Sequence, residues 1–355
     1  MADSPLVVIS ILNWNGCQLT LACLESVRWL EYPNYLTVVL DNGSWDDSAE
    51  RIKAWAHENL GASHVLADYT PEIALQGGDP QTEEALENLP SPARLVLIRN
   101  EENLGFTGGN NITISYALRR GFAPDYVLLL NNDACLEPDC LAELIAAGTA
   151  ANAGIVGAVL RPMREVLHGE EVPNNLGSKE GSVSANGNAK AAGLDSRTPW
   201  VSRRWVVGGA ALLRRDLLET VRRVQGSYLD ERLFVYCEDV ALSRLAQKLG
   251  YKTVEATQAI GYHVIAGSSG GRHSPFEYYY STRNILLLAA MLDPGKRFRL
   301  YVVQVVRTMG RILKCLARGR PRTAHAVFCG FVDACTGVDG KWKHHDREAA
   351  RGGTP

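Results

Sequence analysis

The feature that most constrains the fold is a set of apolar runs that each stop at a cluster of polar residues. The runs PLVVISIL, YLTVVL and YVLLL are typical of buried strands, and helical apolar spacing over 17–30 and 49–60 alternates with the first two. Their polar ends are Asn13 and Asn15, Asp41 and Asn42, and Asn131, Asn132 and Asp133. This alternation favours a mostly parallel α/β sheet with helices on both faces. Ligands bind at the carboxyl edge of such sheets, so the clusters predict one shared ligand site.

Bulk properties narrow the class of protein. The 355 residues suffice for one large α/β domain or two smaller ones, and the net charge of −2 argues against nucleic acid as a partner. The eight cysteines form no CxxC pair, and the start MADSPLVVIS lacks the basic region of a secretory signal. We therefore expect reduced thiols and a cytoplasmic protein. No run of about 18 apolar residues occurs, so a membrane-spanning helix is not expected.

Two residues are candidate metal ligands. Asp133 follows a strand directly, and hard cations such as Mg²⁺ use one or two carboxylates together with phosphate oxygens and water. A turn residue that caps the next helix is the alternative for Asp133. His263 ends another predicted strand and reads either as a metal ligand or as a core histidine.

Other polar residues suit nucleotide binding or proton transfer. Asp41 could accept a hydrogen bond from a nucleobase imide, although Asp-Asn-Gly-Ser is also a good turn sequence. The stretch NLGFTGGNN reads as a loop before a helix, where glycines let backbone approach a ligand; it does not have GxGxxG spacing. Glu238 and Asp239 begin a helix, where one carboxylate can act as a general base or both can complement the helix dipole. Arg283 lies in an apolar helix and requires an anionic partner, either a phosphate or a carboxylate such as Glu277.

Together these stretches resemble an inverting glycosyltransferase of family 2, in its rhamnosyltransferase-like branch. The resemblance rests on SILNWNG, VVLDNGSWDDS, NLGFTGGNN, LLLNNDA, VVGGAALLRRDLL, LDERLFVYCEDVALSRLAQKLGY, YHVIAGSSGG and YYYSTRN, which occur in the family's order over residues 6–285. It implies a GT-A fold and a nucleoside diphosphate sugar donor. Two departures stand out: Asn131 replaces the first acid of the Asp-x-Asp-type metal motif, and the acidic stretch 68–87 reads as a solvated insertion.

The resemblance also implies roles for single residues. Asp239, with Glu238 beside it, matches the Glu-Asp motif that holds the general base, while Asp133 and His263 match metal positions for Mg²⁺ or Mn²⁺. Asp41 matches the position that reads the base, and Arg283 with Asn284 matches an RN pair. The predicted nucleotide-sugar residues are Asn13, Asn15, Asp41, Asn42, Asn103, Gly105, Gly108, Asn110, Asn111, Asn131, Asn132 and Arg283.

The implied reaction is transfer of a sugar, L-rhamnose first, from a deoxythymidine or uridine diphosphate donor. The acceptor is a hydroxyl of a glycan or lipid-linked molecule, as in polysaccharide biosynthesis for the cell envelope. A non-catalytic nucleotide-sugar-binding protein and a nucleotidyltransferase are the alternatives. The products of donor turnover distinguish the three classes.

The domain prediction places a GT-A catalytic domain at 1–290, with a nucleotide-binding half over 1–135 and an acceptor half over 136–290. A mobile loop is expected over 165–200, C-terminal basic helices over 291–335 and a disordered tail over 336–355. Residues 296–322 hold nine Lys or Arg and no acid. On a helix, Lys296, Arg307, Arg311, Lys314 and Arg318 oppose Val302, Val305, Met309, Ile312 and Leu316. This pattern is typical of a helix at the inner face of a membrane; packing on the catalytic domain or in a homodimer is the alternative.

Overall fold

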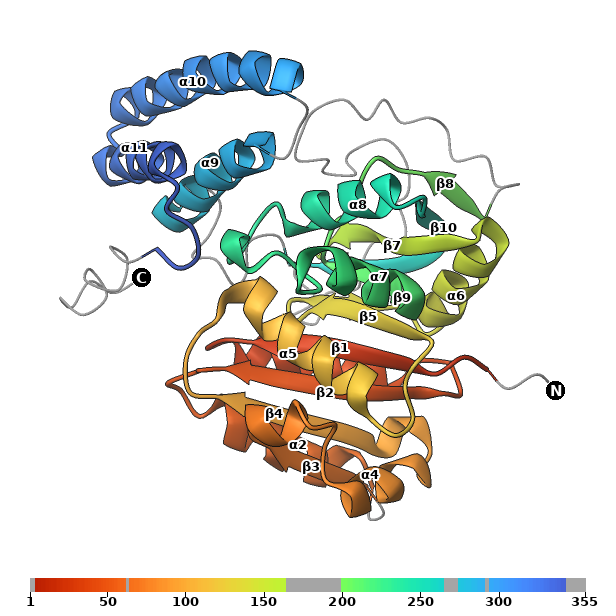
Figure 1. The fold of residues 1–355 in the computed structure, drawn as a ribbon. Helices are drawn as coiled ribbons and strands as arrows, with labels where there is room; N and C mark the ends of the chain where they lie inside the picture. The colour runs from red at the N-terminus through yellow and green to blue at the C-terminus, as the bar shows by residue number, and fades with distance from the viewer. Residues whose placement is uncertain (1–3, 62–63, 164–198, 265–273, 291–293, 343–355) are drawn as a thin grey trace. The chain divides into compact units, whose positions relative to one another are not determined.

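The computed structural model describes residues 4–61, 64–163, 199–264, 274–290 and 294–342 (Figure 1). Most of the predicted loop, over 165–198, and the tail from residue 343 lie outside the described residues. The chain forms two compact units. The first comprises Met1–Asn103, Gly109–Tyr228 and Leu242–Ile265, and the second comprises Leu104–Gly108, Leu229–Ala241 and Ala266–Pro355.

The first unit is built on a ten-stranded sheet, in the order β3-β4-β2-β1-β5-β9-β7-β10-β6 with β8 paired to β10. The first five strands of this order are mutually parallel, β9 runs antiparallel to both its neighbours, and β7 and β10 are parallel. The strands are β1 (Val7–Asn13), β2 (Tyr35–Asn42), β3 (Val65–Tyr69), β4 (Arg94–Asn100), β5 (Tyr126–Asn131), β6 (Ala134–Leu136), β7 (Ala153–Pro162), β8 (Trp200–Ser202), β9 (Ala210–Arg214) and β10 (Lys252–His263).

Helices cover both faces of this sheet because successive strand residues point to opposite sides. One face packs its apolar side chains against α1 (Cys17–Arg28), α2 (Ser48–Asn59) and α6 (Cys140–Ala151). The other face carries α5 (Gly105–Arg119), which Figure 1 shows crossing β1 and β2. A Cβ at Gly109 would lie 2.3 Å from Leu12 Cδ1, so this helix packs closely on β1. The predicted mixed α/β fold is confirmed.

The structure corrects the expectation of a loop over 103–111, because α5 already begins at Gly105. Glycine and asparagine are poor helix formers, so propensity alone favours a loop here. Tertiary packing overrides that preference: Gly109 sits tightly on Leu12, and Ser10 Oγ donates to Asn110 Oδ1 at 2.9 Å.

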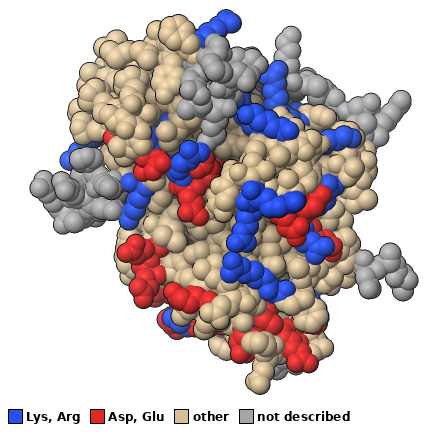
Figure 2. Space-filling model, in the orientation of Figure 1, with Lys and Arg blue, Asp and Glu red and all other residues tan. Residues whose placement is uncertain are grey.

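The acidic stretch 68–87 is not simply solvated. It forms α3 (Pro71–Ala74) and α4 (Pro80–Glu87), and Figure 2 shows acidic side chains gathered where α2, β3 and α4 lie. Glu83, however, is buried and pairs with buried Arg120 at 2.5 Å. The phenol hydroxyls of Tyr69 and Tyr116 donate to Glu83 Oε1 at 2.9 and 2.8 Å. The buried Glu83 therefore connects α4 to the end of α5 through its ion pair with Arg120 and its hydrogen bond from Tyr116.

The second unit contains three long helices, α9 (Pro275–Ala290), α10 (Pro294–Ala317) and α11 (Pro321–Thr336). Aromatic stacking holds α9 to the segments on either side of it. Tyr279 stacks on Trp342 with ring centroids 4.2 Å apart, and Tyr280 stacks on Phe234 at 5.3 Å. In the described residues, none of the helices has both the length and the hydropathy that crossing a membrane requires. Helix α7 (Arg215–Gln225) belongs to the first unit, and α8 (Glu238–Lys248) begins in the second.

Candidate functional site

The polar strand ends lie at one edge of the sheet in the first unit. The register pairs Asn13 with Asp41, Asn42 with Asn100, and Leu12 with Asn131, so four parallel strands end side by side. Asn100 was not predicted, although ARLVLIRN ends in the same way as the other runs. The sequence pattern could have found it.

Hydrogen bonds join the ends of β1 and β2 into a fixed network. Asn13 Nδ2 donates to Asp41 Oδ1 at 2.8 Å, and Ser44 Oγ donates to the same oxygen at 2.5 Å. Thr20 Oγ1 donates to Asn13 Oδ1 at 2.7 Å and accepts from Asn132 Nδ2 at 3.0 Å. These bonds fix the orientation of the Asp41 carboxylate. Both of the bonds to Asp41 end on Oδ1.

A second group of amides continues the edge at β4 and the start of α5. Asn100 Nδ2 donates to Asn42 Oδ1 at 3.1 Å, and Asn42 Nδ2 donates to Asn103 Oδ1 at 3.0 Å. Asn110 and Asn111 are buried on α5. The structure therefore brings the asparagines predicted at this edge into one amide-rich surface.

Several buried polar atoms at this edge have no hydrogen-bond partner among the described residues: Trp14 Nε1, Asn15 Nδ2, Asn100 Oδ1 and Asp133 Oδ1. Buried polar groups are paired in the great majority of cases, so such atoms need an explanation. Asn15 also has a left-handed backbone with φ of 48°, and Trp14 meets exposed Trp45 edge to face. These buried polar atoms therefore lie at the sheet edge that is predicted to bind the ligand.

Asp133 and His263 form a close pair in the first unit. Asp133 is buried, and its Oδ1 lies 2.9 Å from His263 Nε2 at an angle that does not make a hydrogen bond. Backbone pairing fixes both residues, since β10 runs antiparallel to β6 and Val264 N donates to Asp133 O. Asn131 Nδ2 lies 3.5 Å from the same histidine nitrogen.

These two side chains are suitable ligands for a divalent cation whose remaining coordination positions are filled by other ligands. No cluster of three His, Cys, Asp or Glu residues placed to hold a metal occurs in the described parts of the chain. One carboxylate and one imidazole are a small ligand set, and Mg²⁺ and Mn²⁺ are often held by few protein ligands plus substrate phosphate.

The predicted acid pair lies in the second unit, at the start of α8. Glu238 is half-buried overall, but its Oε2 is enclosed and accepts no hydrogen bond from the described residues. Burial, and then the neighbouring charge of Asp239, raise the pKa of Glu238 to about 8. The shift favours the protonated form of Glu238.

The segment before Glu238 is strained. Phe234, Tyr236 and Cys237 have φ of 62°, 67° and 69°, a left-handed conformation that costs L-residues energy. Asn284 on α9 restrains this segment, because its Nδ2 donates to the carbonyl oxygens of Leu233, Val235 and Tyr236 at 2.9, 2.8 and 2.8 Å. The fully buried RN pair therefore supports the turn that leads into the acid pair.

Arg283 has no carboxylate partner in the part of the chain that the structure describes, and the phosphate alternative stays a prediction. Its guanidinium is fully buried and donates to four neutral oxygens, namely Asn284 Oδ1, Gly340 O, Arg232 O and Leu233 O. It also lies over the ring of Tyr280 at 4.8 Å. Several carbonyl dipoles and an aromatic face take the place of one carboxylate.

Gly105 and Gly108 belong to the second unit and serve close packing there. Gly105 has φ of +73°, and a Cβ would lie 2.5 Å from Phe234 O. Only glycine combines that conformation with that approach. A Cβ at Gly108 would lie 2.8 Å from Leu104 Cβ.

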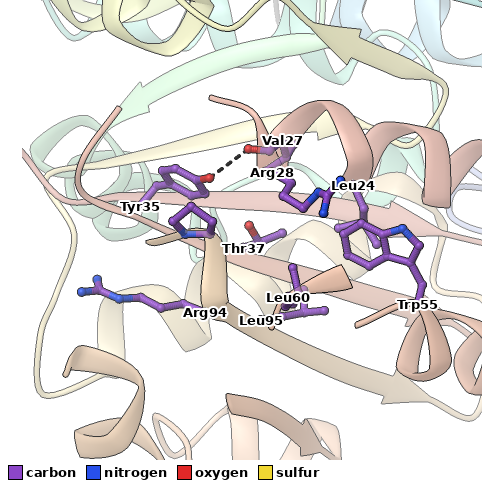
Figure 3. A pocket seen from close by; sticks show the side chains of 10 residues that line it. Leu24, Val27, Arg28, Tyr35, Thr37, Trp55, Leu60, Arg94 and Leu95 are labelled. Carbon is purple, nitrogen blue, oxygen red and sulfur yellow. Dashed lines mark hydrogen bonds between the residues drawn. The ribbon is translucent and has the colours of Figure 1, made fainter. Parts of the chain in front are cut away.

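A small pocket lies far from the polar edge within the first unit (Figure 3). Leu24, Tyr35, Trp55 and Leu95 are among the residues that line it, and Tyr35 donates its hydroxyl to Val27 O at 2.9 Å. Tyr35 begins β2 and Leu95 is the second residue of β4, so the pocket lies at the amino ends of these strands. It therefore lies at the opposite ends of these strands from the polar residues.

The sheet, with polar residues at the carboxyl ends of its parallel strands, is an α/β fold of the GT-A kind. Comparison with protein families gives a match to glycosyl transferase family 2 over residues 73–222. This match supports the resemblance to the family over that segment, which contains Asn103 and Asp133 but neither Asp41 nor Asp239. No curated protein sequence matches the chain.

Solved structures of glycosyltransferases share the fold. A mannosyltransferase, PcManGT from Pyrobaculum calidifontis in complex with GDP-Man and Mn²⁺, matches with a TM-score of 0.53 at 15% identity, over 99% of this chain and 80% of that one. Residues 1–349 of S. aureus TarS in complex with UDP-GlcNAc match with a TM-score of 0.53 at 14% identity, over 93% and 81%. At such identities these likenesses show the fold.

Proposed function

We propose that this protein is an inverting glycosyltransferase that uses a nucleoside diphosphate sugar donor. The observation that carries the proposal is the carboxyl edge of the sheet, where the Asp41 network, the amide surface and the Asp133–His263 pair lie within one unit. The family match and the shared fold with enzymes solved with GDP-Man or UDP-GlcNAc support it.

Asp41 is proposed to read the nucleobase. Asn13 and Ser44 both donate to its Oδ1, which leaves Oδ2 to accept an imide N–H. Asn15, Asn42, Asn103, Asn110, Asn111, Asn131 and Asn132 are proposed to line the nucleotide and sugar. The unmet donors Trp14 Nε1 and Asn15 Nδ2 suit the hydroxyl and carbonyl oxygens of such a ligand.

Asp133 and His263 are proposed to hold Mg²⁺ or Mn²⁺ together with the donor's diphosphate oxygens. When bound, such a cation offsets the negative charge that the departing diphosphate gains. With only two protein ligands, the site should take up metal and nucleotide together rather than metal alone.

Asp239 is proposed as the general base that accepts the proton of the acceptor hydroxyl. The pKa of Glu238 is raised to about 8, so Glu238 holds a proton at neutral pH and is a poor base there. Direct attack by the hydroxyl then gives inversion.

Arg283 and Asn284 are proposed as positioning residues. The Arg283 guanidinium donates to the carbonyl oxygens of Gly340 and Leu233, and Asn284 holds the strained turn before Glu238. Gly105 shares this role, since its close approach to Phe234 fixes the same turn.

The transferred sugar is proposed to be L-rhamnose from a deoxythymidine or uridine diphosphate, and the acceptor a glycan or lipid-linked hydroxyl. This choice rests on the sequence motifs of the rhamnosyltransferase-like branch. Guanosine diphosphate mannose and uridine diphosphate N-acetylglucosamine are the first competitors to test, because the similar structures contain them.

The experiment compares Asp239→Asn with Glu238→Gln at pH 7. Asp239→Asn should lower sugar transfer by on the order of 10²-fold or more with donor binding retained, because only the proton acceptor is lost. Glu238→Gln should cost much less, since it mimics the protonated side chain. The base assignment is wrong if the two effects are reversed.

A further inference from the structure

Helix α10 of the second unit carries an exposed apolar stripe. Eight large apolar side chains on it are exposed, led by Phe298 at 75% and Val306 at 67%, and all of them except Val303 form the stripe. The stripe is Phe298, Val302, Val305, Val306, Met309, Leu313 and Leu316. At about 100° per residue these positions fall within an arc of about 100°. Isolated exposed apolar residues are ordinary, but a continuous stripe along about five turns marks an interaction surface.

The stripe is not the face by which α10 packs within its own unit. Thr308 and Cys315 are buried on a different side of the helix, and Arg311 lies 5.8 Å from the ring of Tyr278 on α9. Figure 1 shows α10 alongside α9 and α11. The packing face and the exposed stripe are therefore separate, and α9 and α11 leave the stripe uncovered.

The side of α10 next to the stripe is basic. Arg299, Arg307, Lys314 and Arg318 are exposed and fall within a further arc of about 100°. The helix contains no Asp or Glu. Its surface is therefore an apolar band bordered by positive charge, over a helix too charged to cross a bilayer.

We propose that α10 docks on an anionic lipid surface, with the stripe among the acyl chains and the basic side facing the headgroups. Lipid chains match the apolar band, and anionic headgroups supply the negative charge that the helix lacks. A second copy that docked through its own α10 would present the same positive side, and that helix contains no Asp or Glu to supply the counter-charge. The proposal concerns where the protein acts and does not depend on which sugar it transfers.

The test is flotation of the full chain with vesicles at about 50 mM and about 500 mM NaCl. Vesicles of phosphatidylcholine with about one-third phosphatidylglycerol should carry the protein at low salt, at least about tenfold more than phosphatidylcholine alone. Val306→Ser with Leu313→Ser should lower this partition about tenfold or more, because it shortens the stripe without a change in charge. Arg307→Gln with Lys314→Gln should reduce the preference for anionic vesicles.

The matched control is Phe122→Ser with Val224→Ser, which removes two exposed apolar side chains outside α10 and should leave partition unchanged. Equal circular dichroism of all variants shows that they are folded. No association with anionic vesicles at low salt would overturn the proposal, as would association that the stripe variant does not alter. A dimer in light scattering that the stripe variant dissociates, without vesicle binding, would assign the stripe to a second copy instead.

Discussion

Replacing Asn284 with alanine should show what holds the turn before the acid pair. Its Nδ2 donates to three carbonyl oxygens at 2.8–2.9 Å, and two hydrogens serve all three. Each hydrogen bond contributes about 1 kcal/mol net, and each stranded buried carbonyl costs about 1–3 kcal/mol. Leu233 O keeps a second donor in Arg283, so the expected loss of unfolding free energy is about 3 kcal/mol.

Urea denaturation measures that loss. Asn88→Ala is the matched control, because Asn88 Nδ2 makes one exposed bond to Glu84 O, and it should change the unfolding free energy by less than about 0.5 kcal/mol. Asn284→Asp keeps the volume and the oxygen that accepts from Arg283 Nε, so a similar loss would assign the effect to the missing Nδ2 donor.

The Asn284 variant should also transfer sugar on the order of tenfold more slowly under conditions where it is fully folded, with donor binding retained. Transfer should slow while donor binding is retained because the turn orients Glu238 and Asp239. An unfolding free energy within about 1 kcal/mol of the wild type, together with unchanged transfer, would refute the reasoning.

Three further outcomes are expected. Asp133→Ala should weaken nucleoside diphosphate binding by calorimetry in Mn²⁺ and change it little in EDTA; equal wild-type affinity with and without metal would contradict the two-ligand site. Glu83→Gln should lower the unfolding free energy by about 1–3 kcal/mol, because the buried Arg120 loses one of its two carboxylate partners and keeps Glu87 at 2.5 Å. Since the pKa of Glu238 rises from 4.5 to about 8, the folded protein holds a proton that the unfolded chain loses, and stability should fall as pH rises from about 4.5 to 8. Glu238→Gln should flatten this part of the pH profile in urea melts; an unchanged slope would show that Glu238 is not the group.

The sheet and its polar edge could be predicted because buried parallel strands are continuous apolar runs, and their ends coincide with the polar residues. Asn13, Asp41 and Asn131 meet for that reason alone. Asn100 obeys the same rule and was missed only because a single asparagine after ARLVLIRN gives a weaker signal than a cluster.

Features that depend on distant partners could not be predicted. The helix α5 already includes the glycines and asparagines over 105–111 because Gly109 packs on Leu12. Local helix propensity gives no information about this contact. Glu83 is buried because Arg120, 37 residues away, supplies its counter-charge. The partners of Arg283 are carbonyl groups, which every sequence offers everywhere, so no pattern identifies them.

The central claim is tested most directly by the products formed from a nucleoside diphosphate sugar. Wild-type protein is incubated with Mn²⁺ and separate deoxythymidine, uridine and guanosine diphosphate sugars, and phosphorus NMR follows each donor. The account predicts release of nucleoside diphosphate from at least one donor, with loss of the signal in Asp133→Ala. Sugar 1-phosphate as the product would assign a nucleotidyltransferase, because nucleotidyl transfer cleaves the bond between the two phosphates of the donor. Binding of every donor without turnover would assign a binding protein; either result would contradict glycosyl transfer.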